Sequence, residues 1–109
     1  LVTLNDTAYV EMAQALAQQM LKGGKTIEEQ LAVGVQRALV RPAKPEEISI
    51  LKGLYETRKA FYLKNPDIAK KMATDPVRPA PAEIDMIELA TLTTIGNVLL
   101  NLDEFLSRN

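Results

Sequence analysis

The stretch LATLTTIGNVLLNL, residues 89–102, decides the fold, because it contains no charged side chain. A helix that is apolar or neutral on every side is normally enclosed by other helices. The stretch is shorter than the ~20 apolar residues that cross a bilayer and is rich in Thr and Asn, so we expect no membrane span. We therefore predict a helix from about Pro81 to Asn101, with an extension to Leu106 left open, at the centre of a helical bundle.

Capping and breaking residues predict four further helices upstream. Thr26 and Glu29 have the spacing of a capping box, in which each side chain accepts a hydrogen bond from the other residue's backbone amide. Gly23 suits the left-handed end of a helix, Pro42 disfavours helix at the residue before it, and Pro45 suits a first turn. The predicted helices are Thr7–Lys22, Ile27–Val40, Pro45–Lys64 and Pro66–Ala73.

Apolar residues recur along these segments at helical spacing, and no alternating run of strand length is present. The predicted inward-facing residues are Tyr9, Met12, Ala13, Leu16 and Met20 in the first helix, Ile27, Leu31, Val35, Ala38 and Leu39 in the second, and Ile48, Leu51, Leu54, Tyr55, Phe61 and Tyr62 in the third. The sequence predicts an all-α fold: a compact orthogonal bundle of about five helices, forming one domain over residues 1–109.

The chain contains neither Cys nor His. It therefore cannot form a disulfide, a thiol nucleophile, a c-type haem attachment site or a Cys/His zinc site. A Ser-His-Asp or Cys-His catalytic arrangement is excluded for the same reason. We expect no cofactor, no metal site and no catalytic residue within this segment.

The charge balance argues against a nucleic-acid partner. Thirteen basic residues stand against 14 acidic ones, for a formal net charge of −1, whereas nucleic-acid-binding domains usually have a basic excess. The second and third helices have a helix-turn-helix outline, but Glu46 and Glu47 would repel phosphates. Several basic residues gather on the third and fourth helices, and we interpret them as a solvated face, with a binding site for an acidic partner as the alternative. They are Arg58, Lys59, Lys64, Lys70 and Lys71.

Four charged residues form the first group of candidate contacts. Arg37 and Arg41 lie one helical turn apart, so they could clamp an anion or carboxylate. We favour a structural role, in which they complement the helix dipole and pair with a carboxylate such as Glu46 or Glu104, and Arg41 is the better candidate for a structural ion pair. Asp103 and Glu104 could bind a cation or act as acid and base, but adjacent residues on one helix diverge. We favour pairing with Arg37, Arg41 or lysines.

Asn97 and Asn101 lie on one side of the otherwise apolar last helix. A buried amide without a hydrogen bond costs about 1–3 kcal/mol. We therefore expect both amides to bind the backbone ends of neighbouring helices, with a ligand contact as the alternative.

Three blocks of sequence resemble a known family. They are LND at 4–6 with VEMA at 10–13 and LA at 16–17, RALVRP at 37–42 with PEE at 45–47, and LLNLDEFL at 99–106. Their order resembles the C-terminal domain of unknown function, number fifteen-fifty-three, of large planctomycete-type surface proteins. The chain departs from that pattern at Thr7, where Pro is frequent, at Val40, where Gly is frequent, and in lacking a Trp in its last helix.

The resemblance implies a context rather than a mechanism. Full-length members of that family look exported to the periplasm or cell surface, and many carry a c-type haem domain and a second uncharacterised domain upstream. The C-terminal domain itself has no assigned activity. The chain begins at Leu1 rather than Met, and we expect it to be a segment of such a longer protein.

Three functional classes follow. The first is a non-catalytic C-terminal module that packs against upstream domains of its parent protein. The second is one wall of an active site whose catalytic residues lie upstream, in a polysaccharide-linked or redox enzyme. The third is a free-standing partner-binding domain, for which we expect an exposed apolar patch of more than a few hundred Å².

Overall fold

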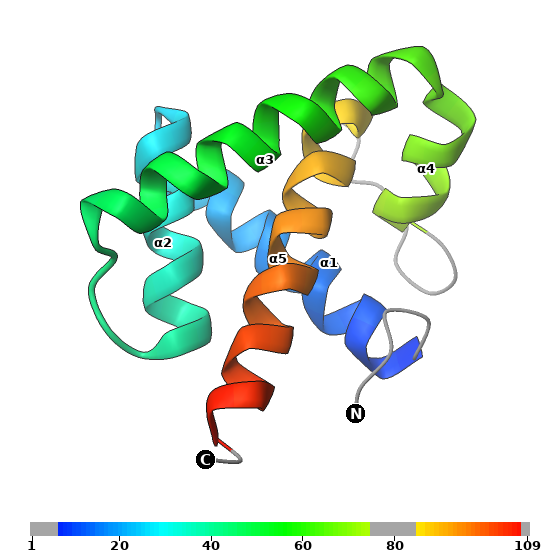
Figure 1. The fold of residues 1–109 in the computed structure, drawn as a ribbon. Helices are drawn as coiled ribbons and strands as arrows, with labels where there is room; N and C mark the ends of the chain where they lie inside the picture. Colours follow the sequence, from blue (N-terminus) through cyan, green and yellow to red (C-terminus); the bar gives the residue numbers. More distant parts are fainter. Residues whose placement is uncertain (1–6, 75–84, 108–109) are drawn as a thin grey trace.

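A computed structural model describes residues 7–74 and 85–107 (Figure 1). Within these ranges the chain forms five α-helices and no strand. The helices are α1 (Thr7–Gly23), α2 (Ile27–Leu39), α3 (Pro45–Lys64), α4 (Pro66–Thr74) and α5 (Met86–Ser107). The predicted all-α class is confirmed, and each of the first four helices lies within one residue of its predicted bounds.

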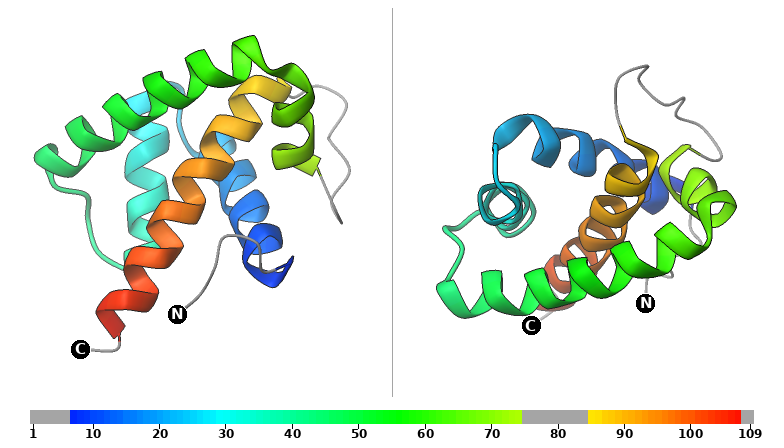
Figure 2. Two further views of the ribbon diagram at one scale, coloured as in Figure 1. Left: turned by 45° about the vertical axis from the view of Figure 1, so that its right-hand side comes forward. Right: turned by 90° about the horizontal axis from the view of Figure 1, so that it is seen from above.

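Helix α5 is the centre of the bundle, as the charge-free stretch predicts. It contacts each of the other four helices. Seen from above, it passes between α1 and α3, with α2 on one side and α4 on the other (Figure 2). The inner face of α5 is fully buried at Leu89, Leu92 and Ile95. The absence of charged residues from this part of the helix therefore corresponds to enclosure by neighbouring helices.

The bounds of α5 differ from the prediction. The helix begins at Met86 rather than near Pro81, because Asp85 caps it. The Oδ1 atom of Asp85 accepts hydrogen bonds from the backbone amides of Ile87, at 2.8 Å, and of Glu88, at 3.4 Å. The carboxylate satisfies donors that lack a partner in a first helical turn. At its other end α5 continues to Ser107, past both Asn101 and Leu106.

The turns around α2 follow from its caps. The predicted capping box is present: Oγ1 of Thr26 accepts from the amide of Glu29 at 3.2 Å, and Oε1 of Glu29 accepts from that of Thr26 at 3.2 Å. At the other end Val40 adopts a left-handed conformation, with φ 55° and ψ 42°. It is the single non-glycine residue with positive φ among those described.

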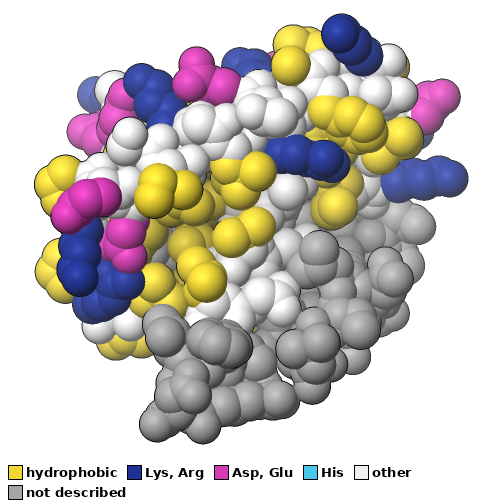
Figure 3. Space-filling view, viewed as in Figure 1, with side chains coloured by type: hydrophobic (Ala, Val, Ile, Leu, Met, Phe, Trp, Pro, Cys, Tyr) yellow, Lys and Arg dark blue, Asp and Glu magenta, His cyan; other side chains and the backbone are white. Residues whose placement is uncertain are grey.

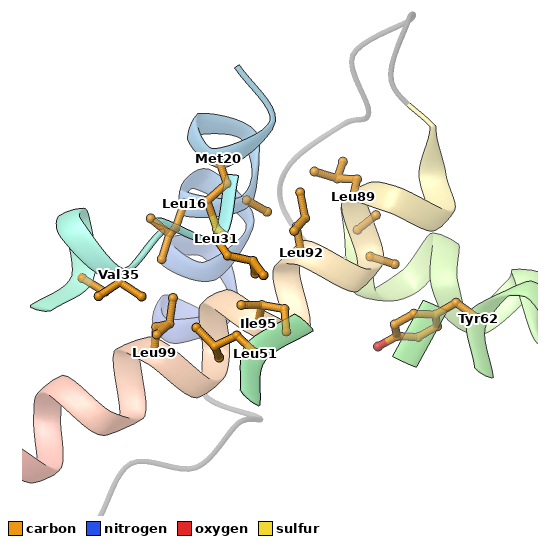
Figure 4. Close-up of a cluster of buried hydrophobic side chains, with 14 of the residues drawn as sticks. Leu16, Met20, Leu31, Val35, Leu51, Tyr62, Leu89, Leu92, Ile95 and Leu99 are labelled. Atoms are coloured by element: carbon orange, nitrogen blue, oxygen red, sulfur yellow. The ribbon is translucent and has the colours of Figure 1, made fainter. Parts of the chain in front are cut away.

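The core is built from small and aliphatic side chains of all five helices (Figure 4). Where α1 crosses α5 the backbones approach closely, since a Cβ on Gly96 would lie 3.1 Å from the carbonyl oxygen of Ala13. Among the predicted inward-facing residues whose side chains are described, which leaves out Tyr9, two do not face inward: Met12 is 52% exposed and Phe61 is 37% exposed. Phe61 lies beside the buried Tyr62 and covers it from outside, with the two rings edge to face.

Candidate functional site

The first candidate residue, Arg41, forms a structural ion pair at the corner between α2 and α3. Its Nη1 and Nη2 atoms contact Oε1 and Oε2 of Glu47 at 2.8 and 2.5 Å. The predicted carboxylate partner is thus Glu47, the third residue of α3, rather than either of the two examples, Glu46 and Glu104. Oε1 of Glu47 also accepts the backbone amide of Lys44 at 2.9 Å. The Arg41 guanidinium, and then this amide, lower the pKa of Glu47 to about 2.

Arg37 does not join Arg41 on a shared carboxylate. It is exposed near the end of α2, and it forms no ion pair with any residue in the described ranges. Its side chain lines two open hollows, one against the α2–α3 connector and one between α1, α2 and α5. The two-arginine clamp, the alternative to a structural role, is not formed among the described residues, because Arg41 is engaged by Glu47.

Contrary to expectation, neither asparagine of α5 binds the end of a neighbouring helix within the described part of the chain. Nδ2 of Asn101 donates to the backbone carbonyl of Asn97 in its own helix, at 2.8 Å. Asn97 is 2% exposed, and its Oδ1 atom has no hydrogen-bond partner among the described residues. Neither residue lines any of the four hollows found between described residues. Asp103 and Glu104 lie in the last turns of α5, and their side chains fall outside the described part.

A polar cluster that the sequence did not predict joins α3 to α5. The hydroxyl of Tyr55 donates to Oε1 of Glu88 at 2.5 Å, and Nζ of Lys59 contacts the same oxygen at 2.6 Å. Burial, and then the hydrogen bond to Glu88, raises the pKa of Tyr55, while Glu88 raises the pKa of Lys59. At neutral pH the phenol is thus neutral and the amine charged, so neither Tyr55 nor Lys59 is in the form of a base.

Two members of the predicted solvated basic face are thereby engaged within the chain. Lys59 is paired with Glu88, and the guanidinium of Arg58 lies 4.5 Å from the ring centre of Phe61 and 5.0 Å from that of Tyr62. Part of the Tyr55–Lys59–Glu88 cluster could be recognised in the sequence, because residues four apart, such as Tyr55 and Lys59, lie on one side of a helix. The third member of the cluster, Glu88, is distant along the chain and could not be assigned without the fold.

An apolar notch lies between α2, α3 and the C-terminal half of α5, with a volume of about 140 Å³. Figure 3 shows hydrophobic side chains gathered on this face below α3. Glu47 is the one charged residue in the lining, and Arg41 neutralises it. The lining residues are Val35, Leu39, Glu47, Ile50, Leu51, Leu99 and Leu102.

Large aliphatic side chains stand exposed around this notch. Ile50 is 73% exposed and Leu102 is 45% exposed, and both belong to its lining. We call the notch lining the notch face. It is the apolar surface that the sequence did not locate, because the same residue types also build the core.

The described residues contain neither a candidate metal site nor a candidate membrane span. They contain no group of three or more acidic, His or Cys residues placed to hold a metal ion. None of the described helices has both the length and the hydropathy that a membrane crossing requires.

Comparison with known proteins gives no match: no family model, curated protein or solved structure is significantly similar to the chain. Fold and site define a class, a small all-α domain with an apolar surface notch. The resemblance to the C-terminal domain of unknown function stays a prediction.

Proposed function

We propose that this domain is a non-catalytic docking module that packs its notch face against another folded protein surface. The observation that carries the proposal is the notch itself, a hollow lined mainly by aliphatic side chains, of which Ile50 and Leu102 are largely exposed. Exposed apolar surface of this kind is typical of interaction sites. Filling the notch with a partner side chain would remove apolar area from water on both molecules, which favours association.

The course of α5 explains why an apolar surface arises here. The helix is charge-free from Leu89 to Leu102, but enclosure by the other helices is complete only over its first part. By Leu102 the side chain is substantially exposed while the sequence is still aliphatic. The chain thus supplies apolar residues beyond the point where its own helices cover them, and a partner surface would complete that cover.

Two of the three functional classes predicted from sequence agree with a docking module. In the first, the notch face packs against a neighbouring domain of a longer, exported polypeptide, as the family resemblance implies. In the partner-binding class, the notch face binds a separate protein. A wall of an active site is less well supported, because neither Arg41 nor Asn101 lines the notch, and both are hydrogen-bonded within the chain.

Benzene is a suitable probe of the notch, because an apolar cavity of ~150 Å³ lined by Leu, Ile and Phe binds it. We expect benzene to shift the methyl NMR signals of Leu39, Leu99 and Leu102. Leu102→Gln should reduce these shifts, while Ile68→Gln, a matched change at a 46%-exposed residue of α4, should leave them intact. A titration that moves no notch methyl, or moves those of Ile68 equally, would contradict the proposal.

A further inference from the structure

We propose that Arg37 is the centre of a second binding surface, which takes an acidic side chain of a partner protein together with the apolar residues on both sides of it. The surface consists of the two open hollows that meet at Arg37. It shares no lining residue with the notch face, so the inference goes beyond the proposed docking function and does not rest on it.

The two hollows lie on either side of Arg37. Seen from above, α2 stands between α1 and the start of α3 (Figure 2). The first hollow, of about 850 Å³, lies between α2 and its connector to α3, and the second, of about 380 Å³, lies between α1, α2 and α5. Arg37 is the one described residue that lines both. The apolar lining includes Val33, Ala43 and Ile48 in the first hollow and Met12, Leu16 and Leu100 in the second.

Arg37 also supplies the one charge among the described residues that line these hollows. Its side chain is exposed and forms no ion pair with a described residue. Glu28 in α2 and Glu47 in α3 are already paired, with Lys52 and Arg41 respectively. A single unpaired cation between two apolar hollows is complementary to a partner that has a single carboxylate between apolar groups.

The guanidinium group of Arg37 suits a carboxylate because its planar fork can bind both oxygens. Arg41 shows this arrangement within the chain, since its two terminal nitrogens each bind one oxygen of Glu47. Arg58 lies against the rings of two aromatic residues instead. Arg37 is therefore the described arginine that is neither paired with a carboxylate nor stacked on a ring.

The position of Arg37 between the hollows selects the kind of partner. A carboxylate at the end of one apolar tail can fill only one hollow while it binds the guanidinium. An Asp or Glu within a polypeptide has neighbours on both sides, so apolar neighbours can occupy both hollows at once. Both hollows are also open, whereas sites for small ligands enclose most of the ligand surface. The partner is therefore a protein segment with one acidic residue between apolar ones.

The experiment is an NMR titration with a capped peptide that has one Glu between two pairs of leucines, with Ser-Gly tails. We expect the peptide to shift the side-chain Nε–H signal of Arg37 together with the methyl signals of Val33 and Ile48 in one hollow and of Met12 and Leu100 in the other. The same peptide with Gln in place of Glu should bind about 10-fold more weakly, because the charge-assisted hydrogen bonds are lost. Octanoate, a carboxylate with one apolar tail, should shift the signals of one hollow at most.

Substitutions of Arg37 separate binding from a structural role at the end of α2. Arg37→Gln should remove the difference between the Glu and Gln peptides. Arg37→Lys keeps the positive charge that complements the helix dipole, so its melting temperature should match that of the wild type. It should still bind the Glu peptide ~3-fold more weakly, because lysine lacks the planar fork. Lys70→Gln is the matched control, since it removes one positive charge from an exposed residue of α4 and should leave binding unchanged.

Four results would overturn the inference. They are Glu and Gln peptides that bind equally or not at all, octanoate shifts that cover both hollows as the peptide shifts do, an Arg37→Lys chain that binds the Glu peptide as tightly as the wild type, and equal losses from Lys70→Gln and Arg37→Gln. None of these results depends on benzene binding in the notch, so this inference and the proposed docking function fail separately.

Discussion

The charge-free stretch of α5 has two parts, residues 89–97 and residues 98–102, and they have different surroundings. We call them the first and second half of the stretch. From Leu89 to Asn97 the helix is almost entirely buried, with α1, α3 and α4 packed around it. From Val98 to Leu102 it is equally free of charge, but exposure rises to 45% at Leu102. The absence of charge in a helix indicates that other apolar surfaces bury it. It does not indicate whether those surfaces belong to the same chain or to another one. Substitutions in the two halves should therefore differ in their cost to the free monomer.

Truncating one leucine in each half should give the largest difference. Leu92 is fully buried, so Leu92→Ala should lower the free energy of unfolding by about 2–5 kcal/mol, through lost apolar burial and the cavity left behind. Leu102→Ala, in the partly exposed half, should cost less than about 1 kcal/mol in the monomer. Urea unfolding at low protein concentration measures both values. Equal losses would mean that the second half is enclosed as well as the first.

Two helical glycines provide the second comparison. Gly96 lies where α5 crosses α1, and a Cβ there would meet the carbonyl oxygen of Ala13 at 3.1 Å. Because that atom belongs to a helix backbone, Gly96→Ala should lower the free energy of unfolding by about 1–3 kcal/mol, as overpacking does. A Cβ on Gly53, in α3, meets nothing within 4 Å. Gly53→Ala should therefore raise stability by about 0.5–1 kcal/mol, through helix propensity.

The same urea experiment tests this pair, and the two changes should have opposite signs. Stabilisation by Gly96→Ala would show that α1 and α5 can separate without loss. The central crossing would then be looser than the structure has it.

Much of the fold could be predicted because its signals are local. The capping box at Thr26 and the breaker Pro42 act within a few residues, so the bounds of α2 follow from sequence. The start of α5 was misplaced because Pro81 is a strong local signal, whereas the cap at Asp85 is recognised only with its hydrogen bonds to Ile87 and Glu88. The central position of α5 was predictable because a helix without charge on any side is stable in water only when neighbouring helices enclose it.

The candidate site was less predictable because it depends on contacts between helices. Sequence identified Arg41 as a structural residue but not its partner, since Glu46 and Glu47 are adjacent and only the backbone path selects one of them. The exposure of Ile50 could not be predicted either, because α3 carries apolar residues on several sides. Which of them face the core depends on where α5 and α4 lie against the helix.

The ion pair at the α2–α3 corner, beside the less enclosed half of α5, should give the smallest effect. Arg41, and then the backbone amide of Lys44, lower the pKa of Glu47 from 4.5 to about 2, so these contacts stabilise the fold where the carboxylate is charged. That contribution is fully present above pH 4.5, the value for an unpaired carboxyl, and is lost as the pH falls towards about 2. Arg41→Ala should therefore lower the melting temperature by a few degrees at pH 7, and the gap from wild type should narrow on acidification.

Thermal melts from neutral to acidic pH measure that gap, and Glu47→Gln provides the control. In the Glu47→Gln background the titrating group is gone, so adding Arg41→Ala should produce no loss that depends on pH over this range. A melting gap that stays constant down to acidic pH would show that Arg41 acts through packing of its side chain rather than through its charge. The corner beside the notch would then be held in the same way as the enclosed half of α5, by contact alone.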